Sequence, residues 1–316
     1  MHPAASVIFF TTASGAGYGL LFLLGIAGAS GLVEPSRAFG VIALAISLGL
    51  ITGGLITSTA HLGRPERAWR AMSQWKSSWL SREGVAAVVT YLPAGVFAIG
   101  WVFFEETQGI WAFFGLLASL GAVATVYCTA QIYATLKTIP SWNNPLVMPG
   151  YLALALYTGG LWMTALVAGF SGGETGIFGP LTVLVGVLAV AIKLVYWRST
   201  SEADSNSTSG TATGLGALGR VRLFEAPSTS ENYVMREMGY RIARKHADRL
   251  RKIALATAFL TPIIFLLLAL AAGGEAAAIL ALLAALSGTL GTLVERWLMF
   301  AEARHVVTLY YGAEAA

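Results

Sequence analysis

The chain has 316 residues, of which 56% are hydrophobic and only 11% are charged. Soluble domains carry about 25% charged residues, and a soluble protein of this length could not bury so much apolar surface, so the composition indicates a bilayer protein. The net charge of +4 says little until the charges are placed, and the single Cys128 excludes an intrachain disulfide and a cysteine-held iron–sulfur cluster.

Eight apolar runs are long enough to cross about 30 Å of hydrocarbon as helices. Lipid offers no partners for backbone N–H and C=O groups, so each run is predicted to be α-helical. The first run is too long for a signal-peptide core and no basic segment precedes it, so we interpret it as a permanent span. The predicted spans are residues 7–30, 39–60, 85–104, 110–134, 148–170, 177–195, 253–272 and 276–294.

The lysines and arginines are distributed very unevenly between the two sides of this arrangement. With eight spans both termini share a side, and that side receives 19 of the 20 Lys and Arg residues when Lys193 and Arg296 are counted at span ends. Only Arg37 lies opposite, together with Glu34, Glu105, Glu106, Glu174 and Glu275. The positive-inside rule therefore predicts a multi-pass bacterial inner-membrane protein with both termini in the cytoplasm.

Residues 61–83 place a histidine, several cations and three tryptophans between the second and third runs. Gly63 and Pro65 break the helix at once, as a backbone folding around a ligand would. A histidine with an ordinary pKa of about 6.5 exchanges protons readily, while arginines supply donors and tryptophans supply flat apolar walls. This combination favours a quinone ligand. The candidate quinone-binding residues are His61, Gly63, Arg64, Arg67, Trp75, Trp79 and Arg82, with Trp69 and Arg70 beside them.

Each of these residues taken singly also has an explanation that needs no ligand. A histidine at a helix end is most often a capping or interfacial residue, and tryptophan belts and inner arginines are common in membrane proteins. That alternative stays open at this point.

Residues 198–252 form the one long extramembrane segment between spans. It begins with a Ser-rich linker that cannot pack a core, and Ser228-Thr-Ser-Glu231 then reads as a capping box for an amphipathic helix to about Lys252. This helix is predicted either to lie on anionic lipid head groups or to dock a cytoplasmic protein. Its candidate docking residues are Arg236, Arg241, Arg244 and Lys245.

Other kinds of site find little support. No ionisable residue is expected at mid-membrane depth, which disfavours a proton pump or an ion-coupled carrier. Haem is not expected either, since His2, His246 and His305 lie in tails or in the soluble loop and only a His61–His305 pair is conceivable. No phosphate loop, metal cluster or nucleophile triad is recognisable, and no nucleic-acid partner is expected.

Three weaker features remain. Gly15-Ala-Gly-Tyr-Gly19 is a small-residue face typical of close helix packing. The loop 138–145, which contains Trp142, is expected to cover the quinone pocket or to cap helix ends. Glu295 and Arg296 are expected to face either an interface or each other's neighbours.

The pattern His61-Leu-Gly-x-Pro-x-Arg-Ala…Ser78-Trp-Leu-Ser-Arg-Glu83, followed by Ile139-Pro-Ser-Trp-Asn-Asn144, resembles the membrane-anchor subunits of the dimethyl sulfoxide reductase family (DmsC-like). The resemblance implies an anchor without a metal of its own, which passes electrons between ubiquinone or menaquinone and an iron–sulfur subunit that is joined to a molybdopterin catalytic subunit. It places the quinol-site histidine of the family on His61 and an acidic residue of functional weight on Glu83, which completes the candidate site.

The predicted orientation selects a subgroup of this family. In dimethyl sulfoxide reductases the partner subunits lie outside the cytoplasm, whereas here the motif loop is predicted inside. This is similar to the sulfite dehydrogenase (quinone) anchors (SoeC-like), in which a cytoplasmic molybdoenzyme oxidises sulfite. The alternatives are an anchor for a terminal reductase that oxidises quinol, a purely structural anchor, and, from another class, a transporter.

The resulting hypothesis is an all-α integral membrane protein with three regions. Residues 1–197 form spans one to six with the quinone loop, residues 198–252 form the cytoplasmic linker and docking helix, and residues 253–316 form the last two spans and the tail. Electrons arrive singly from the docked iron–sulfur partner, His61 delivers a proton to a quinone oxygen near Trp75 and Trp79, and Arg64 or Arg82 stabilises the developing negative charge. Glu83 relays protons or holds an arginine in place. Since electrons and protons arrive from the same side of the membrane, the subunit is expected to move no net charge across it.

Overall fold

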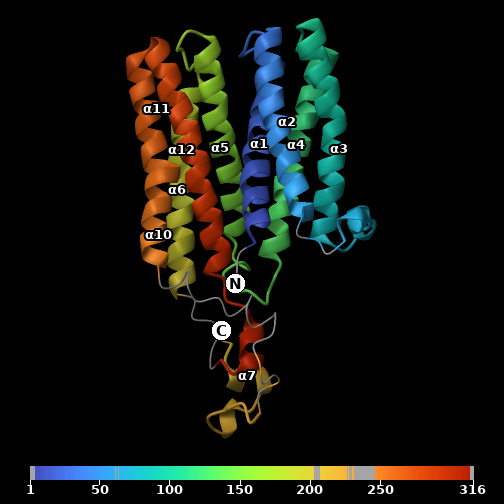
Figure 1. Cartoon of the computed structure of the whole chain (residues 1–316), viewed down its shortest axis with the longest axis vertical. Helices are drawn as coiled ribbons and strands as arrows, with labels where there is room; N and C mark the ends of the chain where they lie inside the picture. The colour runs from blue at the N-terminus through green and yellow to red at the C-terminus, as the bar shows by residue number, and fades with distance from the viewer. Residues whose placement is uncertain are drawn as a thin grey trace.

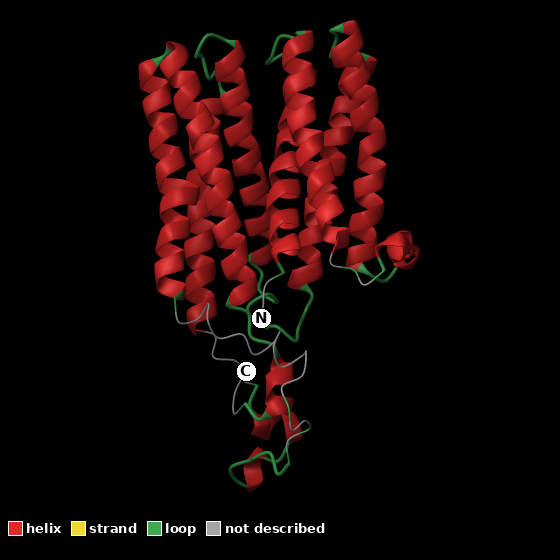
Figure 2. Cartoon of the chain, viewed as in Figure 1, coloured by secondary structure: helices red, strands yellow, loops and turns green. Residues whose placement is uncertain are grey.

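A computed structural model of the protein describes residues 4–60, 62, 64–202, 207–225, 227, 230 and 246–313. Its regular elements are helices, and the long ones run side by side in one bundle (Figures 1 and 2). They are α1 (Ala5–Ala29), α2 (Arg37–Ala60), α3 (Trp79–Ile99) with its π-helical end η2 (Gly100–Phe104), α4 (Ile110–Ala134), α5 (Val147–Phe170), α6 (Phe178–Glu202), the continuous α10 (Ala247–Ala254), η4 (Leu255–Leu260) and α11 (Thr261–Ala272), and α12 (Gly274–Ala301).

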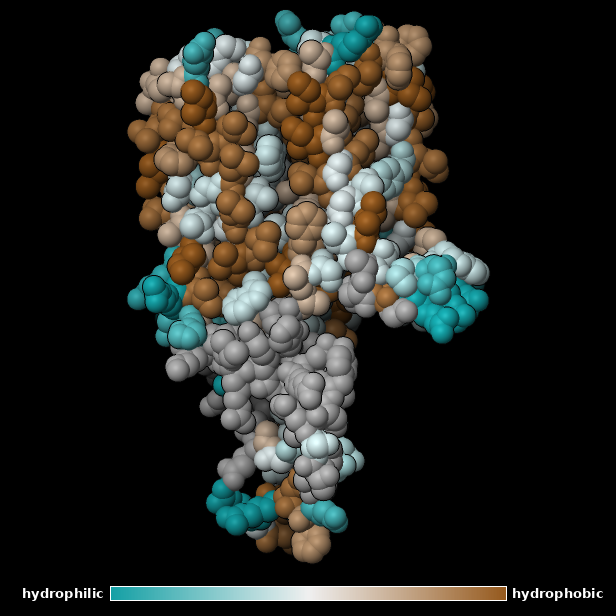
Figure 3. Space-filling view, in the orientation of Figure 1, coloured by the Kyte–Doolittle hydropathy of each residue, from teal (hydrophilic) through white to brown (hydrophobic). Residues whose placement is uncertain are grey.

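The prediction of eight spans is confirmed, because the described residues contain eight helices long and apolar enough to cross a membrane. Figure 3 shows apolar side chains along the height of the bundle and hydrophilic ones at its two ends. The described chain begins and finishes at the same end of the bundle (Figure 1), as an even number of crossings requires.

The predicted boundaries were wrong at four helices, all at the end that carries the termini. The third helix begins at Trp79 rather than at residue 85, and the seventh begins at Ala247 rather than at 253. The sixth continues to Glu202 rather than ending at 195, and the eighth continues to Ala301 rather than ending at 294. The polar residues there continue the helical backbone, and the Ser78 side chain caps the start of α3 by accepting from the Ser81 N–H. Trp79, Arg82 and Glu83 therefore lie in a helix and not in a loop.

Helices α1 and α5 form the centre of the bundle and are the most buried of the eight. They meet backbone to backbone, because a Cβ atom on Gly19 would overlap the carbonyl of Ala155, and one on Gly159 would overlap Gly19 and Leu20. Gly17 faces α2 in the same way, with Ser47 O 2.7 Å from the position of a Cβ atom. The predicted close-packing role is thus confirmed for Gly17 and Gly19, while Gly15 has nothing within 4 Å.

At the end of the bundle opposite the termini, the lone arginine is neutralised locally. Arg37 pairs with Glu105 at 3.0 Å and donates from Nε to the carbonyl of Val102 at 2.9 Å. The remaining lysines and arginines lie toward the end that carries the termini.

The Gly19 contact gives a direct test of the packing. Gly19→Ala forces α1 and α5 apart and is expected to cost about 1–3 kcal/mol of stability, the usual range for overpacking. Thermal unfolding of the purified protein in detergent measures this, with Gly15→Ala on the same helix as the matched control that should leave the unfolding temperature unchanged. Equal unfolding temperatures for the two variants would contradict the α1–α5 contact.

Candidate functional site

The segment after α2 folds as a ten-residue 3₁₀ helix, η1 (Pro65–Gln74), with Pro65 at its first position. It projects sideways from the end of the bundle that carries the termini (Figure 1). The hydroxyl of Ser81 in α3 donates to the carbonyl of Ala71, and Met72 lies against Gly84, so the segment is fastened to the start of α3. His61 and Gly63 lie outside the described residues.

The exposed face of η1 carries part of the candidate site. Arg64 and Arg67 are exposed, as are Trp69 and Trp75. The contact of Arg67 with Glu66, at 3.9 Å, is a solvent-exposed pair that contributes little. Among the described contacts these side chains form no enclosed pocket, and they present cations and indole rings to whatever lies at this surface.

Arg82 closes the loop onto α3. Its guanidinium donates to the carbonyl oxygens of Trp75 at 2.9 Å and Lys76 at 2.7 Å, and it lies 4.2 Å from the ring centroid of Trp79. Trp79 in turn meets Tyr127 of α4 edge to face at 5.8 Å. Arg82 thus holds the backbone after η1 and the Trp79 ring in fixed positions.

Glu83 lies one turn into α3 and points into the bundle, with only 4% of its surface exposed. It accepts a hydrogen bond from the hydroxyl of Thr129 in α4. The same hydroxyl lies 3.0 Å from the carbonyl of Thr125, so it has two acceptors but one proton to give. The described partner of Glu83 is therefore a threonine and not the arginine that one of our alternatives assigned to it.

A shallow groove runs up the bundle between α2 and α3. Its walls include Leu48 and Ile51 from α2 and Thr90 and Tyr91 from α3, and Tyr18 of α1 lies at its floor. Helices α2 and α3 touch little, and the hydroxyls of Thr52 and Tyr91 bridge them at 2.6 Å. Thr90 and Tyr91 lie seven and eight residues beyond Glu83 on α3, and α2 continues from the groove to residue 60, so both helices lead from the groove toward the candidate site.

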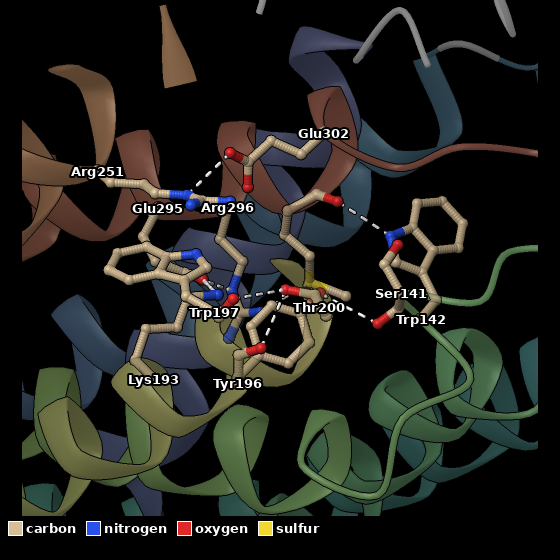
Figure 4. A network of polar contacts seen from close by, with 11 residues as sticks. Ser141, Trp142, Lys193, Tyr196, Trp197, Thr200, Arg251, Glu295, Arg296 and Glu302 are labelled. Carbon is tan, nitrogen blue, oxygen red and sulfur yellow. Dashed lines mark hydrogen bonds and ion pairs between the residues drawn. The ribbon is translucent and has the colours of Figure 1, made fainter. Parts of the chain in front are cut away.

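A second charged centre lies between α6 and α12 and was not predicted from the sequence. Lys193 forms an ion pair with Glu295, whose other oxygen lies 3.5 Å from Nε of Arg296 (Figure 4). All three side chains are buried. Of the two alternatives for Glu295 and Arg296, the contacts agree with neighbouring side chains, since both residues face the interior and Arg296 lies 3.7 Å from the ring centroid of Tyr151. The available signal was a lysine inside an otherwise apolar run, which needs an anionic partner in the same bundle.

This charged centre continues toward the end of the helices. Glu302, just beyond α12, pairs with Arg251 at 3.0 Å (Figure 4). Burial raises the pKa of the Glu302 carboxyl above its usual value, although the neighbouring Arg251 charge opposes that shift. The loop before α5 lies over the same place, because the Trp142 indole donates to the carbonyl of Met299 at 3.0 Å and the Tyr196 hydroxyl donates to that of Ser141 at 3.1 Å. Of the two roles considered for the Trp142 loop, the contacts support the capping of helix ends.

The last histidine has a local role in the described chain. Nδ1 of His305 accepts the N–H of Val307 at 3.0 Å and so caps the short helix η5 (Val306–Tyr311). Partial burial lowers the pKa of His305 below its usual value. The predicted docking residues Arg236, Arg241, Arg244 and Lys245 lie outside the described residues, and α10 begins just after them at Ala247.

Comparison with known proteins places this architecture. The family model described as DMSO reductase anchor subunit (DmsC) matches residues 1–216, which include α1–α6 and the whole of the loop after α2. The chain belongs to the DMSO reductase anchor subunit family. The resemblance seen in the sequence motifs is thereby confirmed, and the transporter alternative is set aside.

The relatives differ in how much of this chain they match. The C subunit of the sulfite dehydrogenase of Allochromatium vinosum is 33% identical over the full length of both proteins. The corresponding subunit of the anaerobic dimethyl sulfoxide reductase of Haemophilus influenzae is 28% identical over 48% of this protein and 54% of its own length, and that of Escherichia coli is 24% identical over 49% and 55%. The similarity to the sulfite dehydrogenase subunit thus extends over α12, and with it over Glu295 and Arg296.

The buried ion pair between α6 and α12 should stabilise the folded anchor. Lys193→Met leaves the Glu295 carboxylate without its closest cation, and breaking a buried pair from one side typically costs about 3–5 kcal/mol. We expect a clearly lower unfolding temperature in detergent for this variant, whereas Lys137→Met, at an exposed position, serves as the control and should behave as the wild type. A Lys193→Met protein as stable as the control would show that the pair does not hold α6 against α12.

Proposed function

We propose that this protein is the quinone-reactive membrane anchor of a heterotrimeric molybdopterin oxidoreductase. In this proposal it passes electrons from an iron–sulfur subunit to the quinone pool, and the catalytic subunit oxidises sulfite in the cytoplasm. The full-length similarity to the C subunit of a sulfite dehydrogenase supports this choice of reaction. The bacterial inner membrane, with both termini inside, is the proposed location.

The observation that carries the quinone proposal is the position of Glu83. A buried carboxyl group sits one turn inside α3, the helix that follows the loop containing His61 and that, two turns further along, forms one wall of the groove between α2 and α3. Burial of an ionisable group in a bilayer helix is costly and is usually retained for function. A quinone fits the surrounding residues, since its ring needs flat apolar walls and its two oxygens need protons.

The roles of the individual residues follow from their contacts. Trp79, fixed between Arg82 and Tyr127, offers an aromatic wall at the start of α3. His61 is proposed to hydrogen-bond a carbonyl oxygen of the ring and to deliver a proton, and Arg64 to stabilise the negative charge that develops there. Arg82 acts in this scheme by positioning Trp79, because Nε and one terminal nitrogen of its guanidinium are bound to backbone carbonyls.

The partner subunits are proposed to dock at the end of the bundle that carries the termini. The described candidate quinone residues, η1 and the Arg251–Glu302 pair lie at this end, so a bound iron–sulfur subunit would stand close to the proposed quinone site. Arg236, Arg241, Arg244 and Lys245 remain the proposed docking residues. Quinone, molybdopterin and iron–sulfur clusters are the proposed redox groups, of which the last two belong to the partners.

The orientation can be measured by cysteine labelling in a Cys128→Ser background. Ser73→Cys in η1 and Ser171→Cys beyond α5 are exposed positions at opposite ends of the bundle. A membrane-impermeant maleimide should label Ser171→Cys in intact spheroplasts, and Ser73→Cys only after the membrane is opened. The reverse pattern would place the termini and the docking surface outside the cytoplasm.

The quinone site is tested by His61→Ala in the assembled complex. We expect loss of sulfite-dependent quinone reduction by about 100-fold, the lower range for removal of a proton donor, while sulfite-dependent reduction of an artificial dye by the catalytic subunits is retained. His246→Ala, at an exposed position, is the matched control and should change neither activity. Unchanged quinone kinetics in His61→Ala would favour a purely structural anchor, and quinol-dependent reduction of an oxide substrate without sulfite oxidation would favour the terminal-reductase alternative.

A further inference from the structure

A small polar cavity lies in the middle of the bundle, between Glu83 and the charged centre of α6 and α12. The cavity has a volume of about 10 Å³ for the centre of a water molecule. This is close to the volume that one bound water molecule needs. Its walls come from four helices. Hydroxyl groups dominate its polar lining, which consists of Thr11, Thr12, Ser14, Thr129, Tyr151, Thr158, Thr292 and Arg296.

The hydroxyl group of Thr12 indicates that a water molecule occupies the cavity. Thr12 is 1% exposed, and its oxygen has no hydrogen-bond partner among the described residues. Leaving such a group unpaired in the interior costs about 1–3 kcal/mol. The neighbouring Thr11, Thr158 and Thr292 donate to carbonyls of their own helices, so their oxygens are free to accept. A water molecule in the cavity would satisfy Thr12 and find several further partners.

The cavity connects groups that do not touch one another directly. On one side Thr129 lines it and donates to Glu83. On the other side Arg296 and Tyr151 line it and also line a second cavity of about 20 Å³, whose walls include Lys193 and Glu295. The two cavities share Tyr151, Leu154 and Arg296 in their walls, so they lie side by side in a row between Thr129, which binds Glu83, and the ion pair of α6 and α12.

We propose that this row is a water-filled proton path that supplies Glu83 from the end of the bundle carrying the termini. The inference rests on the proposed function, because reduction of a quinone takes up two electrons from the iron–sulfur partner and two protons, and the apolar groove offers no water. Water in the second cavity, beside Lys193 and Glu295, passes a proton to the water held by Thr12. That water protonates Glu83 through Thr129. Glu83 then passes the proton on toward His61 and the quinone oxygen.

The two acceptors of Thr129 suit this transfer. When Glu83 is ionised, the threonine hydroxyl donates to it, and when Glu83 carries a proton, the hydroxyl can turn to the Thr125 carbonyl at 3.0 Å and accept from Glu83 instead. The permanently charged Arg296 cannot pass a proton itself. Its guanidinium lies over the ring of Tyr151 and lines both cavities, where its charge favours the binding of water.

The decisive variant is Thr12→Val, which keeps the shape of the side chain and removes the hydroxyl. If the cavity is dry, the substitution removes an unpaired polar group, so the stability of the folded protein should stay the same or rise and quinone-linked turnover should not change. If it holds the proposed water, reduction of a short-chain quinone analogue by the sulfite-fed complex should slow by about 100-fold and its solvent deuterium isotope effect should rise. The KM for the analogue and dye-linked turnover should stay at their wild-type values.

Two further variants distinguish a loss of proton transfer from a loss of the folded structure. Thr12→Ser should restore quinone-linked turnover, and Thr164→Val, a buried threonine of α5 that lines neither cavity, should leave it near the wild-type rate. Quinone-linked turnover of Thr12→Val within twofold of the wild type, with an unchanged isotope effect, would overturn the path while leaving the quinone site intact. Absence of quinone-linked turnover in the wild-type complex itself would overturn the proposed function and the path together.

Discussion

The middle of a bilayer offers no water, so every polar group that the helices carry has to find its partner inside the protein. This constraint explains the arrangement of the bundle. Arg37, at the end away from the termini, is bound to Glu105 and to a backbone carbonyl. The buried charges gather toward the end that carries the termini, where Glu83 reaches Thr129 and Lys193 reaches Glu295.

The packing of α1 decides where these polar groups can meet. The glycine contacts let α5 and α2 approach the backbone of α1, so α1 becomes the central helix and its Thr11, Thr12 and Ser14 face the interior. Helix α3 packs mainly on α4 and touches α2 little. The same arrangement therefore creates a polar interior beside α1 and an apolar groove between α2 and α3, one suited to protons and the other to a hydrophobic ring.

The loop after α2 joins these two features to the surface. Ser81 and Arg82 fasten η1 to the first turn of α3 through backbone carbonyls, which leaves Arg64, Arg67 and Trp75 exposed. Exposed cations and indoles beside a buried carboxyl group are an arrangement that both a docked protein and a ligand at the membrane surface can use. In the proposed complex, electron entry, proton entry and the quinone lie at one end of the anchor, so no charge has to cross the bilayer.

The sequence by itself determined the eight helices, because the length and apolarity of a span are local properties that hydrocarbon thickness selects. It also determined the family, through the motif between His61 and Glu83, and the gathering of cations on one side. Only the tertiary structure decided that Glu83 binds Thr129, and that Lys193 and Glu295, about 100 positions apart, form one ion pair. The physical reason is that a helix end looks the same in sequence whether its charged residue faces water or a neighbouring helix, since the rotation and depth of each helix are fixed by contacts with the others.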